Sequence, residues 1–424
     1  MKTKLCNTAV SFAHSTLLTA CLTALAPMAH AADTLSEALT TGKLSGELRY
    51  RYEWVDQEGV ANKARASTLR TQLGYTTGDF HGVGGFLQFE DVHVVGNERY
   101  NSTINGLTQY PVVADPASTE INQSYLSYAG LPDTTLKYGR QVIVYDNHRF
   151  VGNVGWRQNE QTYDGFTLNN TSLPSTNVSY AHVTNVNRIF SERHPTLSDV
   201  KVDADFLNLA YKGLKAGTVV GYGYLLDYQP AQPFPLTASN KTLGLRFDGG
   251  TPLGATKLLY TAEYAKQNKY ADGATTIDAN YTYAMLGAGL GGVQIKFNYE
   301  LLSGDGIYGL ATPFATLHAF NGWADKFLTT PKDGIKDIFV SAGGALQGTQ
   351  LLLVYHNFSS DYLGYRYGTE WDAQASRKVG KLLTLTAKLA AYNGDNNASN
   401  AARNTAAALA RGIDKAWLQA DVQF

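Results

Sequence analysis

The sequence contains very little cysteine. Its two cysteines, Cys6 and Cys21, both lie within the first 31 residues. Those residues have the features of a removable secretory signal, so the exported chain is expected to carry no thiol at all. This excludes disulfides, thiolate metal sites and nucleophilic cysteine chemistry from the mature protein.

Long apolar runs and an excess of positive charge are also missing. After residue 31 no run of about 20 apolar residues occurs, so no segment is suited to cross a bilayer as a helix. Removing Lys2 and Lys4 from the 35 basic residues leaves 33 against 36 acidic residues, a net charge of −3. A broad basic surface for nucleic acid is therefore not expected.

The first 31 residues follow the order of a signal peptide. Lys2 and Lys4 precede an apolar stretch at 17–26, and Ala29-His30-Ala31 offers a small-x-small cleavage site. The apolar stretch is too short for a signal anchor and is followed by Pro27. Cleavage after Ala31 is the first interpretation; the alternative is a lipoprotein signal cleaved before Cys21.

What the chain does contain is glycine, aromatic residues and strict alternation. It has 41 Gly, 27 Tyr and 17 Phe but 3 Met. In the segment 44–54 apolar residues alternate with Glu47, Arg49, Arg51 and Glu53, and the same period of two recurs along the whole chain. Such strands have one face for lipid and one for water, which is the pattern of a transmembrane β-barrel.

Eighteen segments show this alternation, and sixteen strands is the alternative count. We therefore predict an all-β fold, a transmembrane antiparallel barrel, in which closure of the sheet satisfies every backbone group. The predicted strands are 43–55, 66–77, 82–95, 119–129, 134–144, 161–169, 175–187, 201–212, 215–228, 239–248, 255–267, 277–289, 292–303, 335–343, 349–358, 369–379, 382–393 and 413–424.

The connections alternate between short and long. Short turns are expected on the periplasmic side and long loops outside, as in outer-membrane barrels; the long loops are 96–118, 145–160, 188–200, 304–334 and 394–412. The predicted layout is a signal peptide at 1–31, a short periplasmic segment at 32–42 and a barrel at 43–424. Phe424 ends the last strand and is expected to serve as the signal for the outer-membrane assembly machinery.

Several stretches resemble the alginate-export porin family, large outer-membrane barrels of usually eighteen strands. They are LKYGRQ (136–141), YDNHRFVGN (145–153), WRQNEQTYDG (156–165), TPFATLH (312–318), NGWADKFL (321–328) and the close from GTEWD (368–372) to residue 424. The resemblance implies a passive channel with arginines in its lumen, because a guanidinium pairs well with uronates and other carboxylates.

Candidate pore-lining residues follow from strand parity and from these stretches. Cations expected in the lumen are Arg49, Arg51, Arg70, Arg246 and Lys296 by parity, and Arg140, Arg149 and Arg157 from the resembling stretches. Acids expected there are Glu47, Glu53, Glu263 and Glu300. Three interpretations stay open: an ion-pair ladder that stiffens the wall, an anion-selective constriction, or a specific binding site.

Arg140 is a special case, because strict alternation from Leu136 and Tyr138 places it on the lipid face. A cation at the lipid midplane costs about 2–4 kcal/mol. We therefore expect a β-bulge near Gly139 that turns Arg140 inward.

The 304–334 segment is the candidate constriction loop. It is unusually long and carries apolar residues that an exposed loop does not favour. It is expected either to fold into the lumen or to pack on the outer rim. Its candidate constriction residues are Phe314, His318, Trp323, Asp325 and Lys326.

The expected function is passive diffusion of small or polymeric polar solutes through an outer-membrane channel, with anionic or sugar cargo as the candidate class. The alternatives are a plugged structural or adhesive barrel and an outer-membrane hydrolase. No cofactor, catalytic residue or metal site is expected. The expected surroundings are outer-membrane lipid and lipopolysaccharide.

Overall fold

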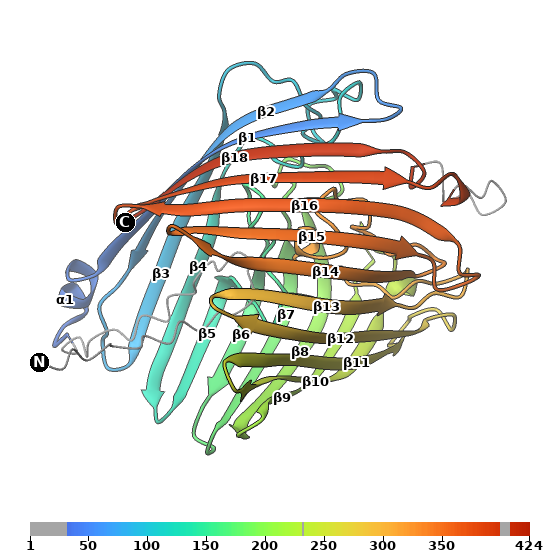
Figure 1. Ribbon diagram of the computed structural model, residues 1–424. Coiled ribbons are helices and arrows are strands. Elements are labelled where there is room, and N and C mark those ends of the chain that lie inside the picture. Colours follow the sequence, from blue (N-terminus) through green and yellow to red (C-terminus); the bar gives the residue numbers. More distant parts are fainter. Residues whose placement is uncertain (1–31, 231–232, 399–407) are drawn as a thin grey trace, which may run out of the picture.

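The computed structural model describes residues 32–424 apart from 231–232 and 399–407. Its main element is one antiparallel sheet of eighteen strands, closed on itself into a barrel (Figure 1). The strands are β1 (Lys43–Gln57), β2 (Ala64–Thr76), β3 (Val83–Val94), β4 (Ser118–Leu131), β5 (Thr134–Gln141), β6 (Thr162–Asn170), β7 (Thr176–Asn187), β8 (Asp199–Leu214), β9 (Gly217–Tyr228), β10 (Asn240–Leu253), β11 (Thr256–Lys269), β12 (Asp278–Leu290), β13 (Val293–Leu302), β14 (Ile335–Leu346), β15 (Thr349–Ser359), β16 (Arg366–Val379), β17 (Leu383–Gly394) and β18 (Ile413–Gln423). The predicted fold class and strand number are confirmed.

The sheet closes between its first and last strands. β1 pairs with β2 on one side and with β18 on the other, from Glu47 opposite Gln423 to Gln57 opposite Ile413. Beyond β18, the backbone N–H of Phe424 donates to the carbonyl of Gly46 at 3.0 Å, and Gly46 returns the bond at 2.8 Å. The Phe424 side chain is 63% exposed on the outer surface. That the outer-membrane assembly machinery recognises Phe424 stays a prediction.

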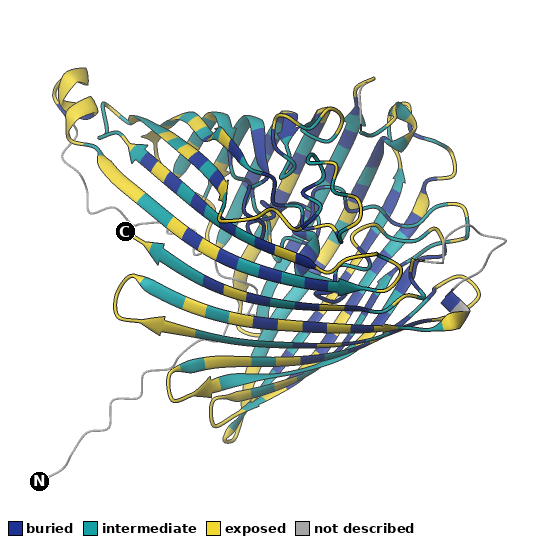
Figure 2. Ribbon diagram, turned by 90° about the horizontal axis from the view of Figure 1, so that it is seen from above, coloured by how far each residue is buried: buried dark blue, intermediate teal, exposed yellow. Residues whose placement is uncertain are grey.

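Side chains alternate between the two faces of the wall. On β13, Val293, Ile295 and Phe297 are exposed to the outside, whereas Asn298 and Glu300 are buried inside. Figure 2 shows the same stripes along the other strands. The alternation that predicted the strands therefore also separates an apolar outer face from a polar lumen.

Several strands extend beyond their predicted ends. One strand was predicted to end at residue 248, but β10 continues to Leu253 and pairs Pro252 with Lys257 of β11. The turn itself is Gly254 and Ala255, with Gly254 at φ +61°. Gly249, Gly250 and Pro252 lie close to this hairpin, but all three are paired with residues of β11.

The predicted periplasmic segment contains a short helix, α1 (Leu35–Thr40). Thr34 caps it, its hydroxyl accepting from the Glu37 amide at 3.1 Å. Tyr75 of β2 donates to the Leu39 carbonyl at 2.6 Å and holds the helix near the barrel end. Among the described residues, no helix is long and apolar enough to cross a membrane. The predicted signal peptide lies outside those residues.

The prediction for Arg140 is wrong. Pairing on both sides of β5 stays in register at Gly139, with Arg140 opposite Ser124 of β4 and Asp164 of β6. Arg140 therefore shares the outward face with Tyr138, which is 71% exposed. Its Nε lies 2.9 Å from an Asp164 oxygen. Because an acid on the neighbouring strand compensates the charge, no bulge is needed to turn Arg140 inward.

Candidate functional site at the barrel waist

Two long loops meet inside the barrel and form its waist. They are the 142–161 loop between β5 and β6 and the 303–334 loop between β13 and β14. The amide of Gly152 donates to the Phe314 carbonyl at 2.9 Å, beside a short parallel bridge between Val151 and Phe314. The Thr316 amide donates to the His148 carbonyl at 3.0 Å. Each loop therefore both donates a backbone hydrogen bond to the other and accepts one from it.

The tip of the 303–334 loop is fixed to the far wall by two backbone donors. The amide of Trp323 donates to Asp372 at 3.3 Å, and that of Ala324 to Glu370 at 2.7 Å. Both carboxylates are buried on β16. Gly322 has φ +83°, and a Cβ there would collide with the Glu370 carboxylate. The structure thus places this loop in the lumen rather than on the rim.

Arg157 connects three separate segments at the waist. Its guanidinium lies 2.9 Å from Glu53 of β1, 3.1 Å from Asp325 of the 303–334 loop and 3.6 Å from Asp115 of the loop before β4. Lys415 of β18 reaches the same Asp325 at 2.6 Å. Burial by itself raises the pKa of Asp325, but Lys415, His318 and Arg157 outweigh it and hold that pKa well below its usual range.

Lys388 of β17 lies in the middle of the waist between two indole rings. Its ammonium is 4.1 Å from the ring centre of Trp156 and 3.7 Å from that of Trp323. It also lies 2.7 Å from Nε2 of His318, whose Nδ1 lies 2.7 Å from Asp325. An ammonium can only donate, so Nε2 accepts and the Nδ1 hydrogen points to Asp325. His318 is therefore neutral, because its Nε2 must carry no hydrogen in order to accept from Lys388.

The closed waist is expected to loosen as pH falls. Burial, followed by the nearby Lys388, lowers the pKa of His318 well below 6.5. Because the closed waist holds His318 neutral, the imidazole contributes its full stabilisation of the closed state only at pH values above its ordinary pKa. This stabilisation is lost progressively as pH falls below about 6.5. Burial also lowers the pKa of His148 in the other loop, which acts in the same direction.

Single-channel recording between pH 7.5 and 5 measures this effect. Conductance or open time is expected to rise on acidification, and His318→Gln, which can accept from Lys388 and donate to Asp325, is expected to remove most of the rise. An unchanged pH dependence in His318→Gln would contradict this role of the imidazole.

Two cavities lie on opposite sides of the 317–326 segment. One, of about 430 Å³, opens toward the long loops and is lined by Leu317, His318, Asp325 and Lys326 among others. The second, of about 170 Å³, lies toward the short turns and is lined by Phe320, Trp323 and Lys296 among others. We call them the outer and the inner vestibule. The 317–326 segment separates them in this structure.

Six of the seven predicted pore arginines face the lumen, and each has a carboxylate partner. The pairs are Arg49 with Asp421 at 2.7 Å, Arg51 with Asp115 at 3.7 Å, Arg70 with Glu47, Arg149 with Glu300 at 3.0 Å, Arg157 with Glu53 at 2.9 Å and Arg246 with Glu263 at 2.6 Å. The four predicted acids, Glu47, Glu53, Glu263 and Glu300, all belong to this ladder. These arginines thus hold the wall and the loops together, as expected of the stiffening ladder.

The predicted loop residues have different roles. Phe314 is buried where the two loops meet, whereas His318, Trp323 and Asp325 surround Lys388 and Arg157. Lys326 points into the outer vestibule and donates to the Ala408 carbonyl at 2.7 Å. Lys388, Trp156 and the carboxylates of β16 are absent from the predicted set. The inward parity of Lys388 and of the β16 carboxylates was visible in the sequence, but not which distant loop they would meet. Trp156 lies in a loop, where alternation gives no direction.

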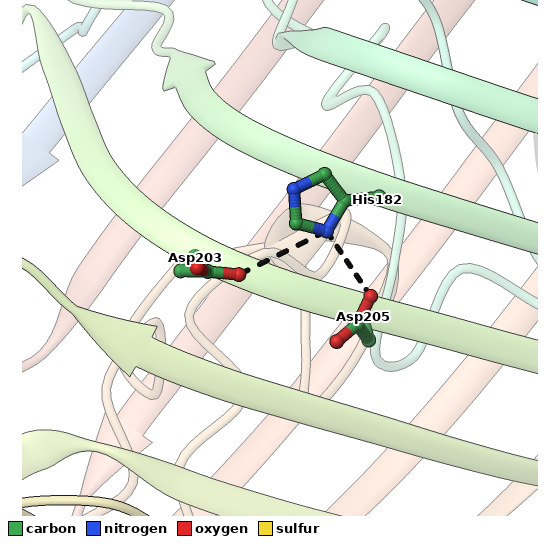
Figure 3. Close-up of side chains that lie close together, drawn as sticks. All are labelled: His182, Asp203 and Asp205. Atoms are coloured by element: carbon green, nitrogen blue, oxygen red, sulfur yellow. Dashed lines mark hydrogen bonds and ion pairs between the residues drawn. The ribbon is translucent and has the colours of Figure 1, made fainter.

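One group of possible metal ligands lies away from the lumen. His182 of β7 and Asp203 and Asp205 of β8 project from the outer face of the wall (Figure 3). Nδ1 of His182 is 3.1 Å from Asp205 and 3.8 Å from Asp203. All three side chains are well exposed, with 41%, 61% and 41% of their surface accessible. This group takes no part in the waist.

A scan against protein families matches alginate export over residues 41–308, which is well over half of the chain. The chain belongs to the alginate export family. Together with the closed barrel, this makes it a porin-like channel of the outer membrane rather than an enzyme. The predicted family, fold and location are thereby confirmed. A search of curated proteins found no match.

Solved structures show the same barrel at low identity. OpdK of Pseudomonas aeruginosa, determined with vanillate, is 14% identical with a TM-score of 0.69, over 91% of this chain and 99% of that one. OccAB3 of Acinetobacter baumannii is 14% identical with a TM-score of 0.68, over 91% and 100%. OccK11 (OpdR) of Pseudomonas aeruginosa is 16% identical with a TM-score of 0.66, over 92% and 97%. At this identity the likeness supports the fold alone.

Proposed function

We propose that this alginate export family channel passes small anionic solutes by passive diffusion and disfavours cations. The observation that carries the proposal is the charge of the inner half of the lumen. There the inward acids Glu47, Asp248 and Asp421 each contact an arginine. By contrast, several inward lysines of this inner half have no ion pair within the described part of the chain; among them are Lys137, Lys212, Lys257, Lys296 and Lys378.

The unpaired lysines give this half of the lumen an excess of positive charge. The stretches outside the described residues contain no Asp or Glu that could compensate it. Charges in a wide aqueous pore are screened over about 8 Å at physiological salt. They therefore act most strongly where the lumen narrows, and Lys296 lines the inner vestibule directly beneath the waist.

Uptake into proteoliposomes tests this proposal with three solutes of similar size. Glucuronate is expected to enter several-fold faster than neutral glucose, and glucosamine more slowly than glucose. Replacing Lys257, Lys296 and Lys378 together by glutamine should bring the three rates close to each other. Fastest entry of glucosamine into wild-type vesicles would contradict the proposal.

A plugged barrel is the second candidate function. The observation that favours it is the waist itself, where both loops and the wall are joined by buried ion pairs. A plugged barrel would show no solute uptake at any pH in wild type, and uptake would begin only after the 303–334 loop is shortened.

A further inference from the structure

One arginine at the outer vestibule differs from the arginines of the ladder. Arg188 directly follows β7, and its guanidinium lies 4.9 Å from the ring centre of Phe190 and 5.8 Å from that of Phe234. Within the described residues it has no carboxylate at ion-pair distance, and the remaining stretches of the chain contain no acid. Its Nε is buried without a hydrogen-bond partner.

A desolvated guanidinium without a counter-charge is costly. Burial lowers the pKa of Arg188, and Tyr228 only partly offsets this effect. Removing a charge from water costs several kcal/mol unless a partner compensates it. The six lumenal arginines described above have that partner within the protein. Arg188 is thus the lumenal arginine best placed to accept an anion from outside.

The vestibule around Arg188 has mostly apolar walls. It has a volume of about 430 Å³, and Val112, Ile189, Phe190, Leu317 and Leu328 contribute to its lining. Small-molecule sites typically measure about 300–1,000 Å³ and combine apolar walls with a few polar groups that orient the ligand. The outer vestibule has this composition, with Arg188 as the orienting charge.

The other cations of the vestibule are already engaged. Arg157 and Lys415 both contact Asp325. Lys326 donates to the Ala408 carbonyl, and burial lowers its pKa to about 8. Among the cations of this vestibule, Arg188 is therefore the one whose guanidinium N–H groups are available to an entering anion.

We propose that Arg188 and the outer vestibule form an entry subsite for monocarboxylates with an apolar body, such as an aromatic ring. The carboxylate pairs with the guanidinium, and the ring lies against Phe190 and the apolar wall. A uronate pairs equally well with Arg188 but leaves its hydroxyl groups against apolar side chains, where each unmade hydrogen bond weakens binding. This inference rests on the proposed anion channel and narrows its substrate class.

Transport of benzoate and glucuronate by wild type and Arg188→Gln tests the subsite. Wild type is expected to take up benzoate at least five-fold faster than glucuronate, and to show benzoate block of the chloride current when benzoate is added on the long-loop side. Arg188→Gln should lose most of this preference and the block while keeping its uptake of glucose. Arg193→Gln is the matched control, since it removes a charge from the same loop outside the vestibule.

The outcomes separate the subsite from the channel. Equal benzoate preference in wild type and Arg188→Gln, or equal loss in Arg193→Gln, would overturn the subsite. Loss of glucose uptake in Arg188→Gln would also overturn it, because the residue would then be structural. If wild type prefers glucosamine over every anion, the proposed function itself fails. If wild type favours glucuronate over benzoate, the channel proposal stands and the apolar subsite is wrong.

Discussion

Removing residues 312–328 and joining the ends by a short glycine-serine linker is expected to raise the single-channel conductance several-fold. This segment separates the two vestibules and contributes Trp323, His318 and Asp325 to the waist. Without it, the 142–161 loop and the loop before β4, which carries Asp115, remain in the lumen but no longer meet a third loop there. The barrel wall should persist, because its strands pair continuously without the loop. Planar-bilayer recording measures the conductance, and an unchanged value would contradict the role of the segment.

A single substitution tests the same role with less disturbance. Gly322→Val places a side chain against the Glu370 carboxylate and should lift the loop tip from β16. Gly364→Val is the matched control, because Gly364 also has a positive φ, +63°, but a Cβ there meets nothing within 4 Å. Higher conductance is expected from Gly322→Val alone. The same change in both variants would point to backbone strain instead of the anchor.

Replacing Arg157 by glutamine is expected to have the largest effect on the stability of the waist. It leaves Glu53, Asp115 and Asp325 without the cation that contacts all three. Arg157 and its acids are almost fully buried, so breaking the pairs should cost about 3–5 kcal/mol. The affected structure is the junction of the loops, while the strand ladder remains.

Limited trypsin digestion of the reconstituted barrel measures this loss. Arg157→Gln should be cleaved rapidly within the 142–161 and 303–334 loops, and its channel should open more often. Arg366→Gln provides the control, since Arg366 is exposed and lies 3.9 Å from Asp395. Equal trypsin resistance of Arg157→Gln and wild type would show that the loops are held by other contacts.

The wall was predictable because its signal is local. Alternation along segments such as 44–54 identifies both a strand and its two faces, and closure follows from the need to pair every backbone group. The exceptions are positions where a neighbouring strand decides the outcome. Asp164 allows Arg140 to face outward, and the ladder to β11 carries β10 through Pro252. Alternation within one strand does not reveal which residue of the neighbouring strand will lie opposite.

For the waist, individual residues could be predicted from the sequence, but the contacts between them could not. Length and apolar content singled out the 304–334 segment, and resemblance singled out Arg149 and Arg157. Their partners, however, lie far away in the sequence: Glu300 for Arg149 and Glu53 for Arg157. Arg188 was absent from the predicted set because its distinguishing feature is a missing partner. Such a feature becomes visible only when the neighbouring side chains are placed.

The reversal potential across a planar bilayer with a salt gradient tests the central claim most directly. One refolded channel between 1 M and 0.1 M potassium chloride gives the sign of selectivity without any choice of cargo. We predict a reversal potential of the sign that marks chloride as the more permeant ion, reduced toward zero in the Lys257, Lys296 and Lys378 triple glutamine variant. A potential that marks potassium as the more permeant ion would contradict the account.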